Sequence, residues 1–260
     1  MRGIENRRVL ITGGCGDIGK AVAARFLAAG ASVVIADKVA DAAGTEVASR
    51  LHAERARFQR CDVTQKDSVS DAVEFAFEWM GGLDVAISNA GAVANAPLLS
   101  VTLEDWQRIL DINLTGSFLF AQKSAQAMLR TARAENAHRG SILFTGSWVQ
   151  DMPWPQGAGY CSSKGGQEML MKVAAQELAA EGITCNIVAP GFVYAGLTKR
   201  IYDSDEQFRH RADNAIPLHR LSTADEVAGA FLFLASEDGA YITGTTLLVD
   251  GGASLVKRSE

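Results

Sequence analysis

The sequence predicts an α/β fold in which one doubly wound, parallel, seven-stranded sheet forms a single domain over residues 1–260. Short runs rich in Val, Ile and Leu alternate with longer segments whose apolar residues recur at helical spacing, and this alternation is typical of a parallel sheet. Runs such as Val33–Ala36 are apolar on both faces, which indicates that helices cover both sides of the sheet. The length of the chain suits one such domain.

The expected strands and helices alternate along the whole chain. The strands are Val9–Thr12, Val33–Ala36, Arg57–Cys61, Val85–Ser88, Ser141–Thr145, Thr184–Val188 and Thr246–Val249. The helical patterns are Ile18–Ala29, Ala40–His52, Asp67–Trp79, Leu103–Ala134, Tyr160–Ala180 and Ala224–Ala235. Residues 191–223 form the longest irregular stretch, which is polar and nearly balanced in charge, so we expect a mobile substrate lid or a pair of loops there.

Composition and charge exclude several classes of protein. With 48% hydrophobic and 21% charged residues the chain has a globular balance, and its formal net charge of −5 argues against nucleic-acid binding. The longest charge-free stretch, Val85–Leu103, contains Asn89, Gly91, Asn95 and Pro97, so it cannot cross a bilayer as an apolar helix. The N-terminus lacks the apolar run of a signal peptide, and the cysteines and histidines lack metal-ligand spacing. We therefore expect a cytoplasmic protein with free thiols and no metal.

A glycine-rich turn follows the first expected strand. Gly14, Gly16 and Gly19 match the pattern G-x-G-x-x-G and open the first helical segment, where glycines let the backbone approach a pyrophosphate at the helix N-terminus. Asp37 ends the second expected strand, 18 residues after Gly19, where its carboxylate can accept hydrogen bonds from an adenosine ribose and repel a 2′-phosphate. A turn that only packs strand against helix is the alternative. The glycines and Asp37 together favour dinucleotide binding, with NAD preferred to NADP.

Three side chains with complementary chemistry lie near the end of the fifth expected strand. Ser147 follows that strand, and Tyr160 and Lys164 lie four residues apart at the start of the next helix, so they share one face. A phenol with a pKa of about 10 is a poor base at neutral pH, but a neighbouring ammonium and an oxidised nicotinamide favour its phenolate form. A solvated helix face is the alternative for Tyr-x-x-x-Lys alone. The cofactor turn earlier in the chain favours proton transfer.

These motifs together make the chain similar to the short-chain dehydrogenase/reductase family, in its compact single-domain branch, and the resemblance covers the whole chain. The landmarks that stand in family order are Thr12–Gly19, Asp37, Cys61-Asp62-Val63, Asn89-Ala90-Gly91, Asn113, Ser147, Tyr160–Lys164, Pro190-Gly191, Ile242–Gly244 and Asp250–Gly252. The resemblance implies a Rossmann fold and an NAD(P)-dependent dehydrogenase or reductase that acts on CH–OH groups.

The resemblance also implies a role for each matched residue. Tyr160 moves the substrate proton, Lys164 lowers the pKa of Tyr160 and holds the nicotinamide ribose, and Ser147 hydrogen-bonds the reacting oxygen. Asn113 supports a proton-relay water. The implied cofactor contacts are Gly13, Gly14, Gly16, Asp17, Ile18, Gly19, Asp37, Asp62, Val63, Asn89, Ala90, Gly91, Tyr160, Lys164, Pro190, Gly191 and Val193. By the same resemblance, the two longest helical segments pair copies of the chain into a dimer or homotetramer.

Two positions depart from the family pattern. Asp17 stands where the turn of the compact branch usually has glycine, and the glycine lies at Gly16 instead, as in the extended branch that includes sugar-nucleotide epimerases. The chain is too short for the separate substrate domain of that branch. A carboxylate at Asp17 can cap the helix, but it repels a pyrophosphate. Ala195 replaces a threonine that contacts the nicotinamide amide, a role that Thr198 could take over.

The segment between Ser147 and Tyr160 carries aromatic and polar residues that we expect at the substrate. Aromatic faces can cover the C–H side of a sugar ring while amides satisfy its hydroxyls, so a sugar or polyol is the expected substrate. The expected substrate contacts are Asn95, Ser147, Trp148, Gln150, Trp154 and Tyr160. For the two tryptophans, packing against a neighbouring subunit is an equal alternative. The cations that would recognise an anionic sugar from the lid are Lys199, Arg200, Arg209 and Arg211.

Other functions compete with a sugar or polyol dehydrogenase. A 3-oxoacyl-thioester reductase or a hydroxysteroid dehydrogenase shares the same motifs, and NADP preference would favour the thioester reductase because biosynthetic reductases generally use NADPH. A catalytically silent dinucleotide sensor belongs to another class of protein. The intact set of Asn113, Ser147, Tyr160 and Lys164 argues against that sensor.

Overall fold

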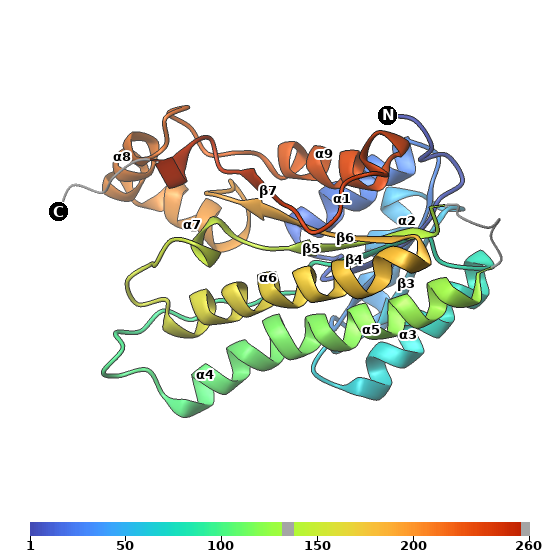
Figure 1. Ribbon diagram of the computed structural model, residues 1–260. Coiled ribbons are helices and arrows are strands. Elements are labelled where there is room, and N and C mark those ends of the chain that lie inside the picture. The colour runs from blue at the N-terminus through green and yellow to red at the C-terminus, as the bar shows by residue number, and fades with distance from the viewer. Residues whose placement is uncertain (132–137, 256–260) are drawn as a thin grey trace.

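The computed structural model describes residues 1–131 and 138–255, and in this part of the chain a parallel sheet of seven strands runs through the molecule (Figure 1). The strands are β1 (Arg8–Thr12), β2 (Ser32–Asp37), β3 (Ala56–Arg60), β4 (Val85–Ser88), β5 (Gly140–Thr145), β6 (Ile183–Pro190) and β7 (Thr246–Val249). Their order is β3-β2-β1-β4-β5-β6-β7, and each neighbouring pair is parallel. The predicted α/β Rossmann fold with a parallel seven-stranded sheet is confirmed.

Helices cover both faces of this sheet. They are α1 (Asp17–Ala28), α2 (Asp41–Leu51), α3 (Lys66–Met80), α4 (Leu103–Leu110), α5 (Gly116–Arg130), α6 (Ala158–Leu178), α7 (Gly196–Ser204), α8 (Glu206–Ala215) and α9 (Ala224–Ala235). In Figure 1, α1 and α9 lie above the sheet, whereas α3, α5 and α6 lie below it. The sheet is therefore doubly wound.

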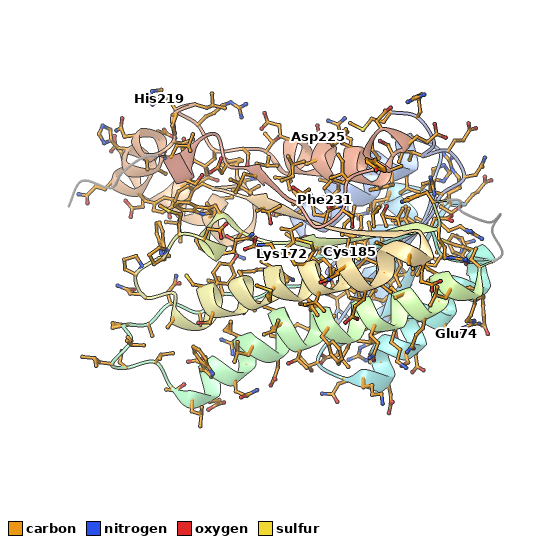
Figure 2. All side chains as sticks on the ribbon, in the orientation of Figure 1. Glu74, Lys172, Cys185, His219, Asp225 and Phe231 are labelled. Carbon is orange, nitrogen blue, oxygen red and sulfur yellow. The ribbon has the colours of Figure 1, made fainter. Side chains whose placement is uncertain are left out.

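The strands supply two apolar cores because successive side chains of a strand point to opposite faces. In β1, Leu10 packs with the layer of α3, α5 and α6, whereas Val9 and Ile11 pack with the layer of α1 and α9. Figure 2 labels one side chain of each core, Phe231 of α9 on one side and Cys185 of β6 on the other. Burial on both faces is the reason that central strands such as β1 and β4 are apolar along most of their length, whereas the edge strand β3 contains Arg57, Gln59 and Arg60.

The region after β4 is less regular than its sequence pattern. The pattern Leu103–Ala134 predicts one continuous helix, but α4 ends at Leu110, a π-helical turn η1 (Asp111–Thr115) follows, and α5 ends at Arg130. Positions 132–134 lie outside the described residues. Single π-helical turns inside α-helices are frequent at functional sites because they re-aim side chains. Here the turn carries Asn113.

Residues 191–223 contain a helical hairpin, α7 and α8, rather than the expected pair of loops. Asp205 separates the two helices and caps α8, since its carboxylate accepts a hydrogen bond of 2.9 Å from the backbone N–H of Phe208. The hydroxyl of Tyr202 in α7 donates to the carboxylate of Asp213 in α8 at 3.0 Å. The polar, charge-balanced composition of this stretch is thus used partly in contacts within the hairpin, which we call the lid hairpin.

The cysteines Cys15, Cys61, Cys161 and Cys185 are free thiols. Burial raises the pKa of Cys61 to about 11 and that of Cys185 to about 12, so these two thiols pack as small apolar groups. Within the described residues, no helix combines the length and apolar character that a membrane crossing needs.

Candidate active site

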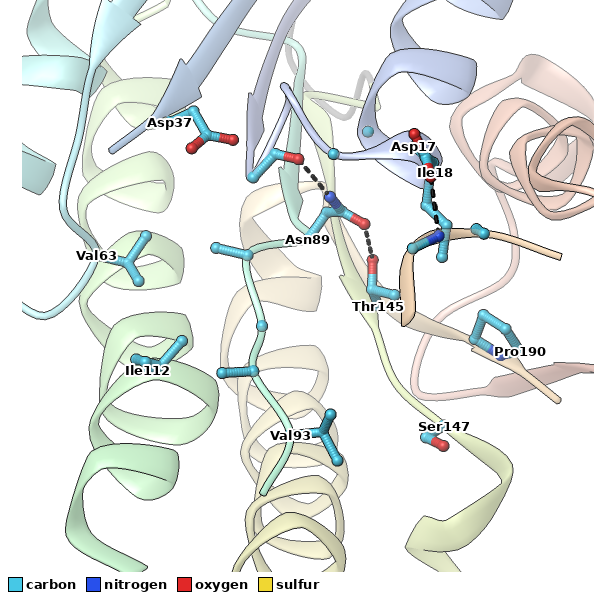
Figure 3. Close-up of a pocket in the computed structure, with 18 of the residues that line it drawn as sticks. Asp17, Ile18, Asp37, Val63, Asn89, Val93, Ile112, Thr145, Ser147 and Pro190 are labelled. Atoms are coloured by element: carbon cyan, nitrogen blue, oxygen red, sulfur yellow. Dashed lines mark hydrogen bonds between the residues drawn. The ribbon is translucent and has the colours of Figure 1, made fainter. Parts of the chain in front are cut away.

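A cavity of about 700 Å³ opens at the carboxyl ends of the strands, next to the switch point between β1 and β4 (Figure 3). Ligands of open α/β sheets bind in this crevice because neighbouring connections leave to opposite sides of the sheet there. The predicted site residues that line the cavity are Gly13, Gly16, Asp17, Ile18, Gly19, Asp37, Asp62, Val63, Asn89, Ala90, Gly91, Ser147, Tyr160, Lys164, Pro190, Gly191 and Val193. Arg108 and Thr145 line it as well, although no sequence motif singled them out.

The glycines of the turn after β1 have different tasks. Gly13 adopts a positive φ of 62°, which favours glycine. A Cβ at Gly14 would overlap the side chain of Ile35, and one at Gly19 would overlap the carbonyl oxygen of Gly13. Gly14 therefore packs the turn against β2 and does not line the cavity. Gly16 precedes α1 without a side-chain cap, so the N-terminal amides of the helix are left for an anion.

Asp37 is fixed at the end of β2 by the glycine turn. One oxygen of its carboxylate accepts a hydrogen bond of 3.0 Å from the backbone N–H of Cys15, and the other is 3.4 Å from the N–H of Val39. These contacts orient the carboxylate without using all of its acceptor capacity, since an ionised carboxylate has about four lone-pair sites. The neighbouring Lys38 also lines the cavity, so both a carboxylate and an ammonium are available to an adenosine ribose.

Asn89 forms hydrogen bonds with residues at the ends of neighbouring strands (Figure 3). Its amide nitrogen donates to the carbonyl oxygens of Thr12 and Gly13, each at 3.1 Å, and its amide oxygen accepts from the hydroxyl of Thr145 at 3.0 Å. The hydroxyl of Thr12 in turn accepts from the backbone N–H groups of Asn89 and Ala90. The floor of the cavity is therefore held by partly buried hydrogen bonds between the ends of β1, β4 and β5.

The unusual Asp17 links the glycine turn to the lid hairpin. Its carboxylate accepts a hydrogen bond of 2.8 Å from the backbone N–H of Gly196, the first residue of α7, and pairs with Lys20 at 3.1 Å. The bond from Gly196 and the neighbouring Lys20 lower the pKa of Asp17, so its carboxylate stays ionised at neutral pH. Ala195 gives α7 no side-chain cap of its own. Asp17 thus supplies from α1 the acceptor that α7 lacks.

Tyr160 and Lys164 project from the first turns of α6 beside Ser147. Burial raises the pKa of Tyr160, and a hydrogen bond with the Ser147 hydroxyl partly opposes this effect. Burial lowers the pKa of Lys164 to about 8. The Lys164 ammonium donates to the carbonyl oxygen of Thr145 at 2.6 Å and lies 5.9 Å from the centre of the Tyr160 ring. The predicted phenol, ammonium and hydroxyl are therefore brought together at one end of the cavity.

Asn113 lies close to this group, but its side chain is engaged elsewhere. Its amide oxygen accepts from the backbone N–H of Ala92 at 2.8 Å, and its amide nitrogen donates to the carbonyl of Ala92 at 2.9 Å and to the hydroxyl of Ser163 at 3.0 Å. Its main-chain carbonyl accepts from the hydroxyl of Ser117 at 2.7 Å. Asn113 therefore anchors the loop after β4 to η1 and α6.

Of the side chains expected at the substrate, Ser147 and Tyr160 line the cavity, whereas Asn95, Trp148, Gln150 and Trp154 are not among its lining residues. Trp148 is buried and packs against Trp154 and Phe192, with ring centres 5.7 and 5.3 Å away. The amide nitrogen of Gln150 donates to Thr246 at 3.1 Å, which directs this side chain toward β7. Asn95 is exposed.

The lid cations also make contacts outside the cavity. The guanidinium of Arg209 donates to the carbonyl oxygens of Tyr202 and Asp203, within the lid hairpin. The ammonium of Lys199 lies 5.1 Å from the centre of the Tyr194 ring. Arg200 is exposed, and the side chain of Arg211 lies outside the described part of the structure. Among the described arginines, Arg108 lines the cavity.

Comparison with known proteins gives consistent matches over nearly the whole chain. The family model described as "Enoyl-(Acyl carrier protein) reductase" matches residues 15–254. The 3-oxoacyl-[acyl-carrier-protein] reductase MabA of Mycobacterium tuberculosis is 35% identical over 250 residues, which cover 96% of this chain and 94% of that protein. A glucose 1-dehydrogenase of Gluconobacter oxydans is 34% identical, with 96% and 92% covered, and a 3beta-hydroxysteroid dehydrogenase of Eggerthella lenta is 34% identical, with 97% and 95% covered.

Solved structures agree with these relatives. A short-chain type dehydrogenase/reductase from Mycobacterium marinum superposes with a TM-score of 0.88 at 35% identity, covering 96% of each chain. A putative gluconate dehydrogenase from Agrobacterium tumefaciens gives a TM-score of 0.90 at 26% identity, covering 98% of each chain. The family predicted from the sequence is confirmed: the chain belongs to the short-chain dehydrogenase/reductase family and is an NAD(P)-dependent oxidoreductase acting on CH–OH groups.

Proposed function

We propose that the protein is an NAD-preferring dehydrogenase that interconverts a secondary alcohol, or a sugar hemiacetal, and the corresponding carbonyl on a small hydroxylated substrate. The observation that carries this proposal is the pairing of two groups along one cavity. Asp37 lies at the ribose end, and Tyr160, Ser147 and Lys164 lie at the reacting end.

The residues of the cavity fit a nicotinamide dinucleotide. Gly13, Gly16 and Gly19 line the cavity without side chains, and the uncapped start of α1 offers its N–H groups to a pyrophosphate. The remaining acceptor capacity of Asp37 suits the two hydroxyls of an adenosine ribose. When bound, the nicotinamide supplies the hydride acceptor or donor.

The chain's own residues would then handle the proton. Tyr160 in its phenolate form takes the proton of the substrate alcohol. The Lys164 ammonium beside it stabilises the negative charge of that phenolate. The Ser147 hydroxyl donates to the oxygen at which negative charge develops. Pro190 at the end of β6 and the following Gly191 line the same cavity.

The preference for NAD rests on the charge at the end of β2. A carboxylate held at Asp37 by the Cys15 N–H would repel the 2′-phosphate of NADP and would lose hydrogen bonds to the esterified ribose oxygen. The adjacent Lys38 acts in the opposite sense. The proposal therefore requires that the fixed carboxylate outweighs the ammonium on its four-carbon stem.

Support for a sugar or polyol substrate comes from the polar residues of the segment between Ser147 and Tyr160 and from the relative named as a glucose 1-dehydrogenase. A sugar acid would need a cation, and Arg108 lines the cavity although its guanidinium also pairs with Asp105 at 3.0 Å, near the surface. The contacts of Arg209 within the lid hairpin make it less suited to this task.

A hydroxysteroid or 3-hydroxyacyl thioester is the second candidate substrate. Trp148, Trp154 and Phe192 form an aromatic cluster beside Ser147, and such a surface suits an apolar substrate. The relatives named as a 3-oxoacyl-[acyl-carrier-protein] reductase and a 3beta-hydroxysteroid dehydrogenase match this alternative.

We also propose that the protein acts in the cytoplasm as a dimer or homotetramer. The outer faces of α5 and α6 expose large apolar side chains, which are Phe118, Leu129, Met169 and Val173. Large apolar side chains left exposed on neighbouring helices favour a subunit contact there. Light scattering of the purified protein after size-exclusion chromatography tests the assembly, and a monomeric mass would contradict it.

One substrate panel tests the proposed function. The purified protein is assayed with NAD⁺ and NADP⁺ against aldoses, sugar acids, polyols, hydroxysteroids and 3-hydroxyacyl thioesters, and Tyr160→Phe is the inactive control. We expect the highest kcat/KM with NAD⁺ and a sugar, sugar acid or polyol. A lead for a steroid or thioester would replace the proposed substrate, and a lead for NADP⁺ would overturn the cofactor assignment.

A further inference from the structure

A buried carboxamide lies directly behind the catalytic lysine. Gln167 is on α6, three residues after Lys164, and its side chain is fully buried. Its amide oxygen accepts a hydrogen bond of 3.2 Å from the Lys164 ammonium. In the sequence this residue stands between a polar stretch and the apolar positions that follow it in the helix.

The other end of the carboxamide belongs to a buried polar cluster. The amide nitrogen of Gln167 donates to the hydroxyl of Ser117 at 2.7 Å and lies 3.4 Å from the main-chain oxygen of Asn113. Ser117 donates its own hydrogen to that same oxygen of Asn113 at 2.7 Å, and its oxygen lies 3.0 Å from the hydroxyl of Ser88. Four elements, α6, α5, η1 and β4, therefore meet at Ser117.

Counting hydrogens fixes the orientation of the Gln167 amide. Ser117 has one hydroxyl hydrogen, and Asn113 receives it, so the bonds from Gln167 and Ser88 must end on the two lone pairs of the Ser117 oxygen. The NH₂ group of Gln167 must then face Ser117, and its oxygen must face Lys164. A flipped amide would place two donors against an ammonium, which has no acceptor.

We propose that Gln167 is a positioning residue for the reaction: its amide oxygen holds the Lys164 ammonium charged and directed at the cavity. The Thr145 carbonyl and the Gln167 oxygen satisfy two of the three hydrogens of the ammonium, and the third remains for the cavity. A buried ammonium without such acceptors would lose its proton more easily. This inference rests on the proposed function only in assigning Lys164 its catalytic use.

The polar cluster behind Lys164 consists of groups that do not ionise. The Asn113 carbonyl accepts from Ser117 at 2.7 Å and lies 3.4 Å from the Gln167 amide nitrogen. A carboxamide accepts and donates hydrogen bonds without gaining or losing a proton at neutral pH. Ser117 and Ser88 at the far end of the cluster are buried. The hydrogen bond between Lys164 and Gln167 therefore serves to orient the Lys164 ammonium.

Ionisable groups other than Tyr160 and Lys164 lie on α6 and on the elements packed against it. They include Cys161 and Glu168 of α6, Asp111 of η1, Asp151 after Gln150, Arg108 of α4, and Tyr202, which packs in the same cluster as Tyr160. Glu168 pairs with Lys172 and Asp111 accepts from Gln107. None of these groups contributes to the lowered pKa of Lys164, which has burial as its cause.

The test compares two substitutions that act in opposite directions. Gln167→Glu places a carboxylate against the ammonium, and Gln167→Met fills the same space without an acceptor. Met171→Leu, one turn further along the same buried face of α6, is the control for packing. The ε-carbon NMR resonance of Lys164, identified by its absence in Lys164→Ala, is followed with pH in each protein and needs no substrate.

We expect Gln167→Glu to raise the pKa of Lys164 by about one unit or more and Gln167→Met to lower it, whereas Met171→Leu leaves it in place. The alkaline limb of kcat should move in the same two directions. Loss of stability or activity without opposite movement of these pH values would overturn the proposal and leave Gln167 as a packing residue. If the Lys164 resonance shifts as expected but no alcohol is oxidised, the proposed function fails and the positioning role stands.

Discussion

The two ends of the active-site cavity are built in different ways. The cofactor end consists of strand ends and the turn after β1, held by bonds such as that from Cys15 to Asp37 and those of Asn89. The substrate end consists of the segment from Ser147 to Tyr160 and the lid hairpin, whose aromatic and charged side chains largely contact one another. The first is fixed by the topology of the sheet, whereas the second depends on how loops and short helices pack.

This difference explains why cofactor chemistry can be argued from the fold while substrate identity needs an experiment. Parallel strands end at one edge of the sheet, so residues that follow them must meet there. No such rule brings Trp148, Gln150 and Arg209 to a common point. Trp148 packs against Phe192, Gln150 donates to Thr246, and Arg209 donates to Tyr202 within the lid hairpin.

The largest expected effect is at Tyr160, which closes the substrate-end segment and faces the cofactor end. Tyr160→Phe should lower kcat by about 100-fold to 10,000-fold, because it removes the general acid–base, while the affinity for NAD⁺ changes little. Tyr241→Phe at a fully exposed position is the matched control. Steady-state kinetics and calorimetric titration of NAD⁺ measure both quantities, and near-normal kcat in Tyr160→Phe would favour the dinucleotide sensor.

The next effect concerns the stability cost of the buried lysine. Burial lowers the pKa of Lys164 from 10.5 to about 8, so the unfolded chain binds more protons than the folded protein between these pH values, and stability rises with pH there. Below about pH 8 the folded protein bears the full cost of the buried charge. Lys164→Met removes this dependence.

The stability gained by Lys164→Met over the natural protein should therefore shrink by about 2–3 kcal/mol as the pH rises from about 7 to about 10.5. Urea unfolding at several pH values measures it. The matched control is Lys172→Met, an exposed lysine two turns along α6. A difference in unfolding free energy that stays constant with pH would show that Lys164 carries no buried charge.

Asp37→Asn tests the cofactor selectivity at the ribose end of the cavity. The amide oxygen of Asn can still accept from the Cys15 N–H, but the negative charge is gone, so the ratio of kcat/KM for NADP⁺ to that for NAD⁺ should rise about 10-fold to 100-fold. Asp41→Asn, at an exposed position in the first turn of α2, should leave the ratio unchanged. An unchanged ratio in Asp37→Asn would assign the selectivity to Lys38.

The smallest effect is expected at Asp17, which links the cofactor end of the cavity to the lid hairpin. Asp17→Asn keeps an oxygen for the Gly196 N–H but removes a carboxylate from the pyrophosphate end of the cavity, so the Kd for NAD⁺ should fall by about 2-fold to 5-fold at low salt. Asp238→Asn, in an exposed ion pair with Arg2, is the control. Weaker binding in Asp17→Asn would mean that its charge serves the lid hairpin more than it opposes the cofactor.

The same comparison explains what could be predicted from the sequence. The positions of Asp37 and Tyr160 follow from strand–helix alternation and motif spacing, and the structure lines the cavity with both. Gly14 was predicted at the cofactor, but its missing Cβ serves the contact with Ile35, which only the paired strands reveal.

Long-range contacts account for most of what the sequence could not predict. The hydrogen bond from Gly196 to Asp17 joins residues that are 179 positions apart, and the sequence around either residue does not predict it. Gln167 lies on the buried face of α6 between Lys164 and Met171, and its partners beyond α6 come from α5 and η1. A buried polar residue three positions after a catalytic lysine is the one local signal that could have pointed to it.

The central claim is that the cofactor end of the cavity binds NAD so that the nicotinamide ring lies beside Tyr160. A crystal structure of the protein with NAD⁺ tests this claim most directly. The account predicts the adenosine ribose hydroxyls on the Asp37 carboxylate, the pyrophosphate at the start of α1, and the nicotinamide beside Tyr160 and Ser147. A dinucleotide bound outside this cavity, or with its ribose turned from Asp37 toward Lys38, would contradict it.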